Sequence, residues 1–179
     1  DGTVIFILGQ GNAGKTGDPR LGIHRWSLST PYDIGSLVVT DNTFTEIGGL
    51  PRGLAFNNDG TKMFVINQTN TLLTEYNLST PYNPDTKTAT NTLTNTTSSG
   101  QYHQGLGFNA DGTKMFVVKG SNGDTGDQID EYALSTAFDI SSSSATLTGT
   151  VSPIFPTVNI NQRISGFAFN SSGTKMYHL

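Results

Sequence analysis

The sequence has no cysteine and very little charge. Without a thiol among its 179 residues, it can form neither a disulfide framework nor a thiolate metal site. Only 13% of the residues are charged, against roughly 25% in ordinary globular domains. The net charge is −4, whereas a nucleic-acid-binding protein needs a clustered excess of lysine and arginine. No stretch approaches the roughly 20 apolar residues of a membrane-spanning helix. We therefore expect neither nucleic acid nor membrane insertion, and the polar, weakly charged composition fits a β-rich protein that works outside the cytoplasm.

One sequence unit recurs along the chain. Its copies read GLAFNNDGTKMFVI at 53–66, GLGFNADGTKMFVV at 105–118 and GFAFNSSGTKMYHL at 166–179, and DGTVIFIL at 1–8 matches its second half. A second segment recurs between these copies, as RWSLSTPYDI at 25–34, EYNLSTPYNP at 75–84 and EYALSTAFDI at 131–140. Such internal recurrence indicates that the same local structure is built several times. The repeat units span approximately 1–52, 53–104, 105–165 and 166–179.

Each repeat is predicted to form four short strands. An apolar strand such as GLAFN precedes an Asp-Gly pair, which supplies the positive φ angles of a tight hairpin turn. The third strand alternates apolar and polar residues, and Ser-Thr-Pro makes the next turn. Four-stranded units at this period, without a helical pattern, predict an all-β fold. We expect a β-propeller of four-stranded antiparallel blades, with about three blades present as a partial ring. Five aromatic residues are expected in its core: Phe56, Phe108, Phe169, Tyr76 and Tyr132.

The recurring FNxDGTKMFV and EYxLSTPYD segments resemble the repeats of YVTN or lactonase-like β-propellers. They are similar to the tandem repeats of surface proteins of marine bacteria and of phage tail fibres. The resemblance covers essentially the whole chain, and it implies the propeller fold. It does not specify a function, because propellers include hydrolases, lectins, adhesins and scaffolds.

Residues 9–16 (GQGNAGKT) have the spacing of a phosphate-binding P-loop. Such a loop requires a helix that begins at Lys15, but Gly17, Pro19 and Gly22 would each break that helix. The repeat also places this segment between the second and third strands of a blade. A surface loop is therefore the favoured interpretation, rather than a nucleotide site.

A metal site has weak support in the sequence. Asp124, Asp127 and Asp130 lie close together, and carboxylate oxygens suit calcium, but their order does not match an EF-hand loop. A polar hairpin loop is the favoured interpretation, with Asp124 and Asp127 as weak calcium candidates and no other cofactor predicted. His24, His103 and His178 have no metal-binding spacing.

The candidate ligand-binding residues lie where the repeats differ. We call one end of the strands the constant end, because it carries the nearly identical DGTK and STPYD turns. The opposite, variable end carries the connections of different length and chemistry, and such loops usually carry recognition. Four residues just before innermost strands are predicted to bind ligand: Arg52, Tyr102, Gln104 and Arg163. Further out at the same end lie Lys15, Arg20, Asp124 and Asp127.

Two functions remain open from the sequence. The first is a non-catalytic extracellular or virion-surface binding or structural module that recognises a cell-surface glycan or protein. This interpretation predicts that the chain is not an enzyme, since no convergent acids, histidines or metal ligands are visible. The alternative is a secreted hydrolase or lactonase-like propeller enzyme. Because the sequence starts and stops within a repeat, we also expect further blades or other copies of the same protein as partners.

Overall fold

A computed structural model of the protein describes residues 2–9, 21–68, 72–94, 101–121, 127–152, 166–170 and 172–178. Nearly all regular structure in these ranges is β-strand, and the helices there are two single 3₁₀ turns. This confirms the predicted all-β class with four-stranded antiparallel blades. No helix of the described part is long and apolar enough to cross a membrane. The chain divides into two compact units, Asp1–Pro51 and Arg52–Leu179.

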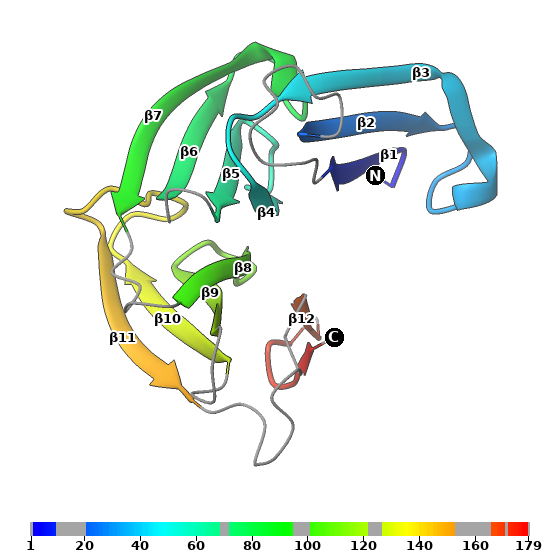
Figure 1. Cartoon of the computed structure of the whole chain (residues 1–179). Helices are drawn as coiled ribbons and strands as arrows, with labels where there is room; N and C mark the ends of the chain where they lie inside the picture. Colours follow the sequence, from blue (N-terminus) through cyan, green and yellow to red (C-terminus); the bar gives the residue numbers. More distant parts are fainter. Residues whose placement is uncertain are drawn as a thin grey trace. The chain divides into compact units, whose positions relative to one another are not determined.

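The first unit contains a three-stranded antiparallel sheet in the order β1-β2-β3 (Figure 1). Its strands are β1 (Val4–Gly9), β2 (Gly22–Leu28) and β3 (Leu37–Glu46). The 3₁₀ turn η1 (Ile34–Ser36) connects β2 to β3. Asp33 stabilises this turn as its N-cap, because its Oδ1 accepts a hydrogen bond of 2.9 Å from the Gly35 amide.

The second unit contains two four-stranded antiparallel sheets and one hairpin. The first sheet consists of β4 (Pro51–Phe56), β5 (Lys62–Asn67), β6 (Leu72–Leu78) and β7 (Lys87–Thr94), with the 3₁₀ turn η2 (Pro84–Thr86) before β7. The second consists of β8 (Gln101–Phe108), β9 (Lys114–Ser121), β10 (Gln128–Leu134) and β11 (Ala145–Val151). The hairpin pairs β12 (Phe167–Phe169) with β13 (Met176–His178). Each four-stranded sheet follows chain order, as expected for a propeller blade.

The two four-stranded sheets pack face to face through one apolar core. Its buried members are Phe64, Ile66, Leu73, Leu106, Met115, Val117, Tyr132, Leu134 and Ile140. The first strands of the two sheets, β4 and β8, approach each other closely. A Cβ atom added at Gly53 would lie only 3.0 Å from the Gly105 Cα. The β12–β13 hairpin packs on the other face of the second sheet, where the ring centroids of Phe116 and Phe169 are 4.7 Å apart.

The predicted aromatic core is wrong in part. Tyr132 is buried, but Phe56, Phe108, Phe169 and Tyr76 are only half-buried. The three phenylalanines each stand at the last position of a first strand, so they close the core at its edge instead of filling its centre. Aliphatic side chains of the second and third strands occupy the centre.

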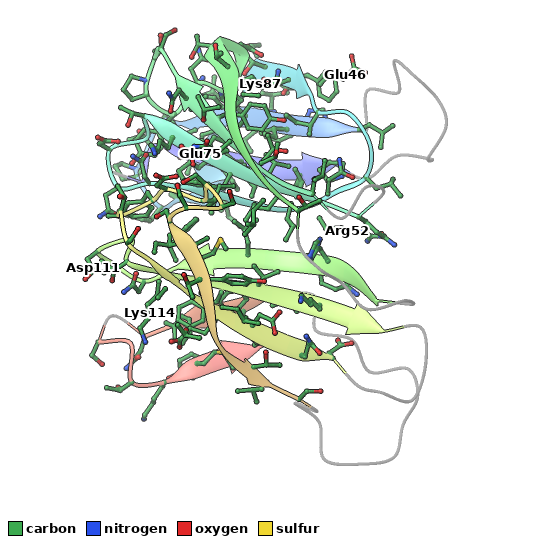
Figure 2. All side chains as sticks on the ribbon, turned by 90° about the vertical axis from the view of Figure 1, so that its left-hand side faces the viewer. Glu46, Arg52, Glu75, Lys87, Asp111 and Lys114 are labelled. Atoms are coloured by element: carbon green, nitrogen blue, oxygen red, sulfur yellow. The ribbon has the colours of Figure 1, made fainter. Side chains whose placement is uncertain are left out.

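The turns of the constant end repeat almost atom for atom in the second unit. The Lys62 amide donates a 2.8 Å hydrogen bond to Asn57 Oδ1, and the Lys114 amide does the same to Asn109 Oδ1. Gly60 and Gly112 both adopt a φ of 71°, as a turn that needs positive φ requires. Figure 2 shows Lys114 at one end of the strands of this unit and Arg52 at the opposite end.

Candidate functional site

Three ionisable residues are buried together at the variable end of the second sheet. His103 comes from the start of β8, Lys119 from the end of β9 and Asp130 from the start of β10. The strand register places His103 opposite Lys119 and Lys119 opposite Gln128. Because cross-strand partners share a face and side chains alternate along a strand, Asp130 lies on this face as well. All three are almost fully buried, His103 completely.

Lys119 and Asp130 form a buried ion pair. The Lys119 Nζ contacts Asp130 Oδ2 directly. The other carboxylate oxygen of Asp130 accepts hydrogen bonds from Thr150 Oγ1 at 2.7 Å and from Gln128 Nε2 at 3.1 Å. Taking two charges out of water costs several kcal/mol per ion, so such a pair persists only when its geometry and further hydrogen bonds offset that cost. The partners of Asp130 meet this requirement and hold the ammonium group in place.

His103 places a buried imidazole beside this ion pair. Neither of its ring nitrogens has a partner at good hydrogen-bond geometry in the described part of the chain, although the Asn67 backbone interacts with the ring. Burial lowers the pKa of His103 to about 4, and the positive charge of Lys119 acts in the same direction, against the Asn67 backbone and Asp130. The imidazole is therefore neutral at pH 7. A buried polar group without a partner costs about 1–3 kcal/mol, which is unusual unless the group has a function.

Three of the predicted ligand-binding residues lie at the same end of the second unit, within the first strands of their sheets. The Arg52 Nε donates a 2.6 Å hydrogen bond to Gln68 Oε1, which ties the start of β4 to the residue after β5. Gln104 follows His103 on β8 and is nearly buried. Tyr102 belongs to β8 as well. Their role in ligand binding stays a prediction.

Most of the other predicted residues lie outside the part of the chain that the structure describes. Arg163, Asp124, Lys15 and Arg20 lie outside the described residues, as does most of the P-loop-like segment. Asp127 is buried directly before β10. In the ranges that the structure describes, no three His, Asp or Glu side chains come together as a metal site. Asp130 is already neutralised by Lys119, which leaves it a poor ligand for calcium.

Neither His103 nor Lys119 was predicted as a site residue from the sequence, although the repeats hold a signal for Lys119. In the preceding repeat, Asn67 occupies the position of Lys119 and Thr74 that of Asp130. Two neutral residues are thus replaced by opposite charges at positions that the repeat register brings close together. His103 has no comparable signal, because a single histidine next to a strand is usually a packing residue.

Comparisons with known proteins identify the fold but not a family. No protein-family model matches the chain. No curated protein matches it either. A nidogen/laminin complex structure matches with a TM-score of 0.57 and 13% identity, covering 98% of this chain and 52% of that one. The periplasmic gluconolactonase of Pseudomonas aeruginosa matches with a TM-score of 0.53 and 16% identity, covering 92% and 45%. A candidate 6-phosphogluconolactonase from Bacteroides uniformis matches with a TM-score of 0.52 and 12% identity, covering 88% and 43%.

These matches correct one prediction from the sequence. The expectation that the chain is not an enzyme is contradicted, because two of the similar structures are named as lactonases. That expectation rested on the lack of convergent acids, histidines or metal ligands in the sequence. The fold, however, brings His103, Lys119 and Asp130 together from three strands. The surface-binding module, the virion location and the likeness to tail fibres receive no support. The chain spans about half the length of the similar structures, and its fold is that of lactonase-like β-propellers.

Proposed function

We propose that this chain is part of a lactonase-like propeller enzyme that hydrolyses a cyclic ester at the variable end of its blades. The observation that carries the proposal is the neutral, buried imidazole of His103 beside the buried Lys119–Asp130 pair. Unpaired titratable groups with displaced pKa values gather at functional sites. The similarity to two lactonase structures supports the same reaction class.

Lactone hydrolysis needs a proton acceptor and a positive field. Water adds to the acyl carbon while a base removes its proton, and the ring C–O bond then breaks as the leaving oxygen takes up a proton. His103 is neutral at pH 7, so one ring nitrogen has a lone pair for the water proton. The guanidinium of Arg52 provides positive charge that stabilises the oxyanion, and the hydrogen-bonding ammonium of Lys119 orders the polar groups around His103. The role of Asp130 is to position Lys119.

The substrate class follows from the same charges. Arg52 is only partly buried, and its guanidinium carries a permanent positive charge at the variable end. An anionic or polyhydroxylated ring suits this surface, because arginine pairs well with carboxylate and phosphate groups. We therefore propose a sugar-acid lactone as substrate. The low charge of the chain and its likeness to a periplasmic lactonase support action outside the cytoplasm.

The test is a pH-stat assay that follows acid release from an aldonolactone and from its phosphorylated form. We expect the wild type to exceed the spontaneous rate, and the rate to fall as the pH decreases toward 4, where His103 takes up a proton. His103→Asn is expected to lose about 10²-fold in kcat, at the lower end of the roughly 10²–10⁴ range of general-base catalysis.

The matched control is Lys87→Met, at the start of β7 on the constant end. It is expected to keep wild-type activity, and circular dichroism checks that both variants are folded. A wild type with no rate above the spontaneous one on either lactone would contradict the proposed function. A folded His103→Asn variant with full activity would contradict the role of His103.

A further inference from the structure

Three strands of the second unit meet at Gly53, near the variable end. A Cβ atom added at Gly53 would lie 2.9 Å from the Ile66 side chain and 3.0 Å from the Gly105 Cα. Gly53 belongs to β4, Ile66 to β5 and Gly105 to β8. Because no side chain separates the strands at this point, β5 and β8 contact each other across the two sheets. The ends of the three strands are therefore close neighbours.

Arg52 ties two of these strand ends together. Its Nε donates a 2.6 Å hydrogen bond to Gln68 Oε1, and we call this bond the Arg52–Gln68 tether. Gln68 directly follows β5, which ends at Asn67. A hydrogen bond from a charged donor is stronger than one between neutral groups. The tether therefore restrains the backbone at the end of β5.

The repeats show that a blade does not need this tether. In the second sheet, Gln104 occupies the position of Arg52, and Gly120 occupies that of Gln68. A glycine has no side chain that could accept the bond, yet the second sheet has the same four strands in the same order. The tether is thus particular to the first sheet, whose face packs against the sheet that carries His103.

The backbone of Asn67, directly before Gln68, interacts with the imidazole of His103. Burial lowers the pKa of this ring most, and the Asn67 backbone acts in the opposite direction. A carbonyl oxygen has that effect, because it accepts from a ring N–H and so favours the protonated ring, whereas an amide N–H would disfavour it. The contact falls short of good hydrogen-bond geometry, as is common for catalytic groups before substrate binds.

The charged groups beside the ring do not offer it a better acceptor. Asp130 is the nearby carboxylate, but its Oδ2 contacts the Lys119 ammonium. Its Oδ1 already accepts from Thr150 Oγ1 at 2.7 Å and from Gln128 Nε2 at 3.1 Å. Lys119 itself can only donate. Among the described residues, the Asn67 carbonyl is therefore the best-placed acceptor for the ring N–H.

We propose that Gln68 is a positioning residue that selects the tautomer of His103 from the neighbouring blade. The inference rests on the proposed function, in which the neutral imidazole takes a proton from water. While Arg52 holds Gln68, the Asn67 carbonyl faces one ring nitrogen and keeps the proton there. The other nitrogen then has the lone pair that accepts the water proton. Without the tether the proton occupies either nitrogen, and the lone pair has no fixed direction.

Long-range ¹H–¹⁵N correlation spectra of the histidine rings in the full chain at pH 7 test the proposal. The signals of His103 are those that disappear in His103→Asn. We expect one tautomer in the wild type and an average of two in Gln68→Met, which keeps the side-chain length but lacks the acceptor oxygen. Gln68→Glu keeps an oxygen for Arg52 and should retain the wild-type tautomer. In the lactone assay, kcat should fall about tenfold in Gln68→Met, less than the roughly 10²-fold cost of a 1 Å misplacement, and recover in Gln68→Glu.

The matched control is Asn58→Ala. The Asn58 Nδ2 donates to the Ala110 carbonyl at 2.8 Å, so this bond also joins the two sheets, but at the constant end. Its loss should leave the tautomer and kcat unchanged. Because the spectra need no turnover, a tautomer that depends on Gln68 in a protein without lactonase activity would support the positioning role and contradict the proposed function. An averaged tautomer in the wild type, a single one in folded Gln68→Met, or an equal change in Asn58→Ala would overturn the inference.

Discussion

The two ends of the β8–β11 sheet use the same strands for different purposes. At the constant end, Asn109, Asp111 and Thr113 satisfy one another in a turn that also occurs at 57–61, so each polar group has a local partner. At the variable end, Lys119 and Asp130 neutralise each other out of water, while neither ring nitrogen of His103 has a partner at good hydrogen-bond geometry among the described residues. The first arrangement stabilises a fold that is repeated. The second sacrifices stability at one place, which is typical of a functional site.

The largest expected effect compares two neighbouring acids of β10. Asp130→Asn leaves Lys119 buried without a counter-charge, so we expect a loss of about 3–5 kcal/mol in unfolding free energy. Glu131→Gln removes half of the exposed pair with Lys114 and should cost less than about 1 kcal/mol. Urea unfolding measures both. Similar losses of unfolding free energy in the two variants would contradict the difference between a buried ion pair at the variable end and an exposed one at the constant end.

The second expected effect is a pH dependence from His103. The pKa of His103 is about 4 in the folded protein, whereas the ordinary value of 6.5 applies in the unfolded chain. Between these two pH values the unfolded state therefore binds more protons than the folded state. Stability from this residue is complete above pH 6.5 and falls as the pH decreases to 4, by about 3 kcal/mol in total. We expect His103→Leu to remove this part of the pH dependence. An unchanged difference between wild type and variant across this range would show that His103 is not buried as a neutral group.

The third and smallest effect compares two turn glycines of the constant end. Both Gly112→Ala and Gly173→Ala force a side chain into positive φ, at about 1–2 kcal/mol. Gly112→Ala also overlaps the Phe138 ring, which adds about 1–3 kcal/mol, whereas no atom of the described residues lies within 4 Å of a Cβ at Gly173. Thermal unfolding should therefore show the larger loss for Gly112→Ala. Equal losses would mean that a ring covers Gly173 after all.

The fold could be predicted from the sequence because its signals are local and repeated. Asp-Gly turns, alternating strands and the Ser-Thr-Pro turn each specify a few neighbouring residues, and their recurrence fixes the four-stranded blade. The candidate site could not be predicted, since it depends on which residues of three strands share a face and on how deeply they are buried. The prediction of the buried aromatic residues was partly wrong for a similar reason. The position of a residue in a strand does not reveal that Phe56 and Phe108 close the core at its edge.

The most direct test of the account is to map where a reaction product binds. The ¹⁵N-labelled protein is titrated with the aldonate formed from the lactone, and backbone amide shifts are followed by NMR. We expect saturable shifts at the variable end, at residues 103–104, 119 and 128–130, and none in the 109–113 turn. Shifts confined to that turn, or no saturable shift at any amide of the variable end, would contradict the claim that this end carries the function.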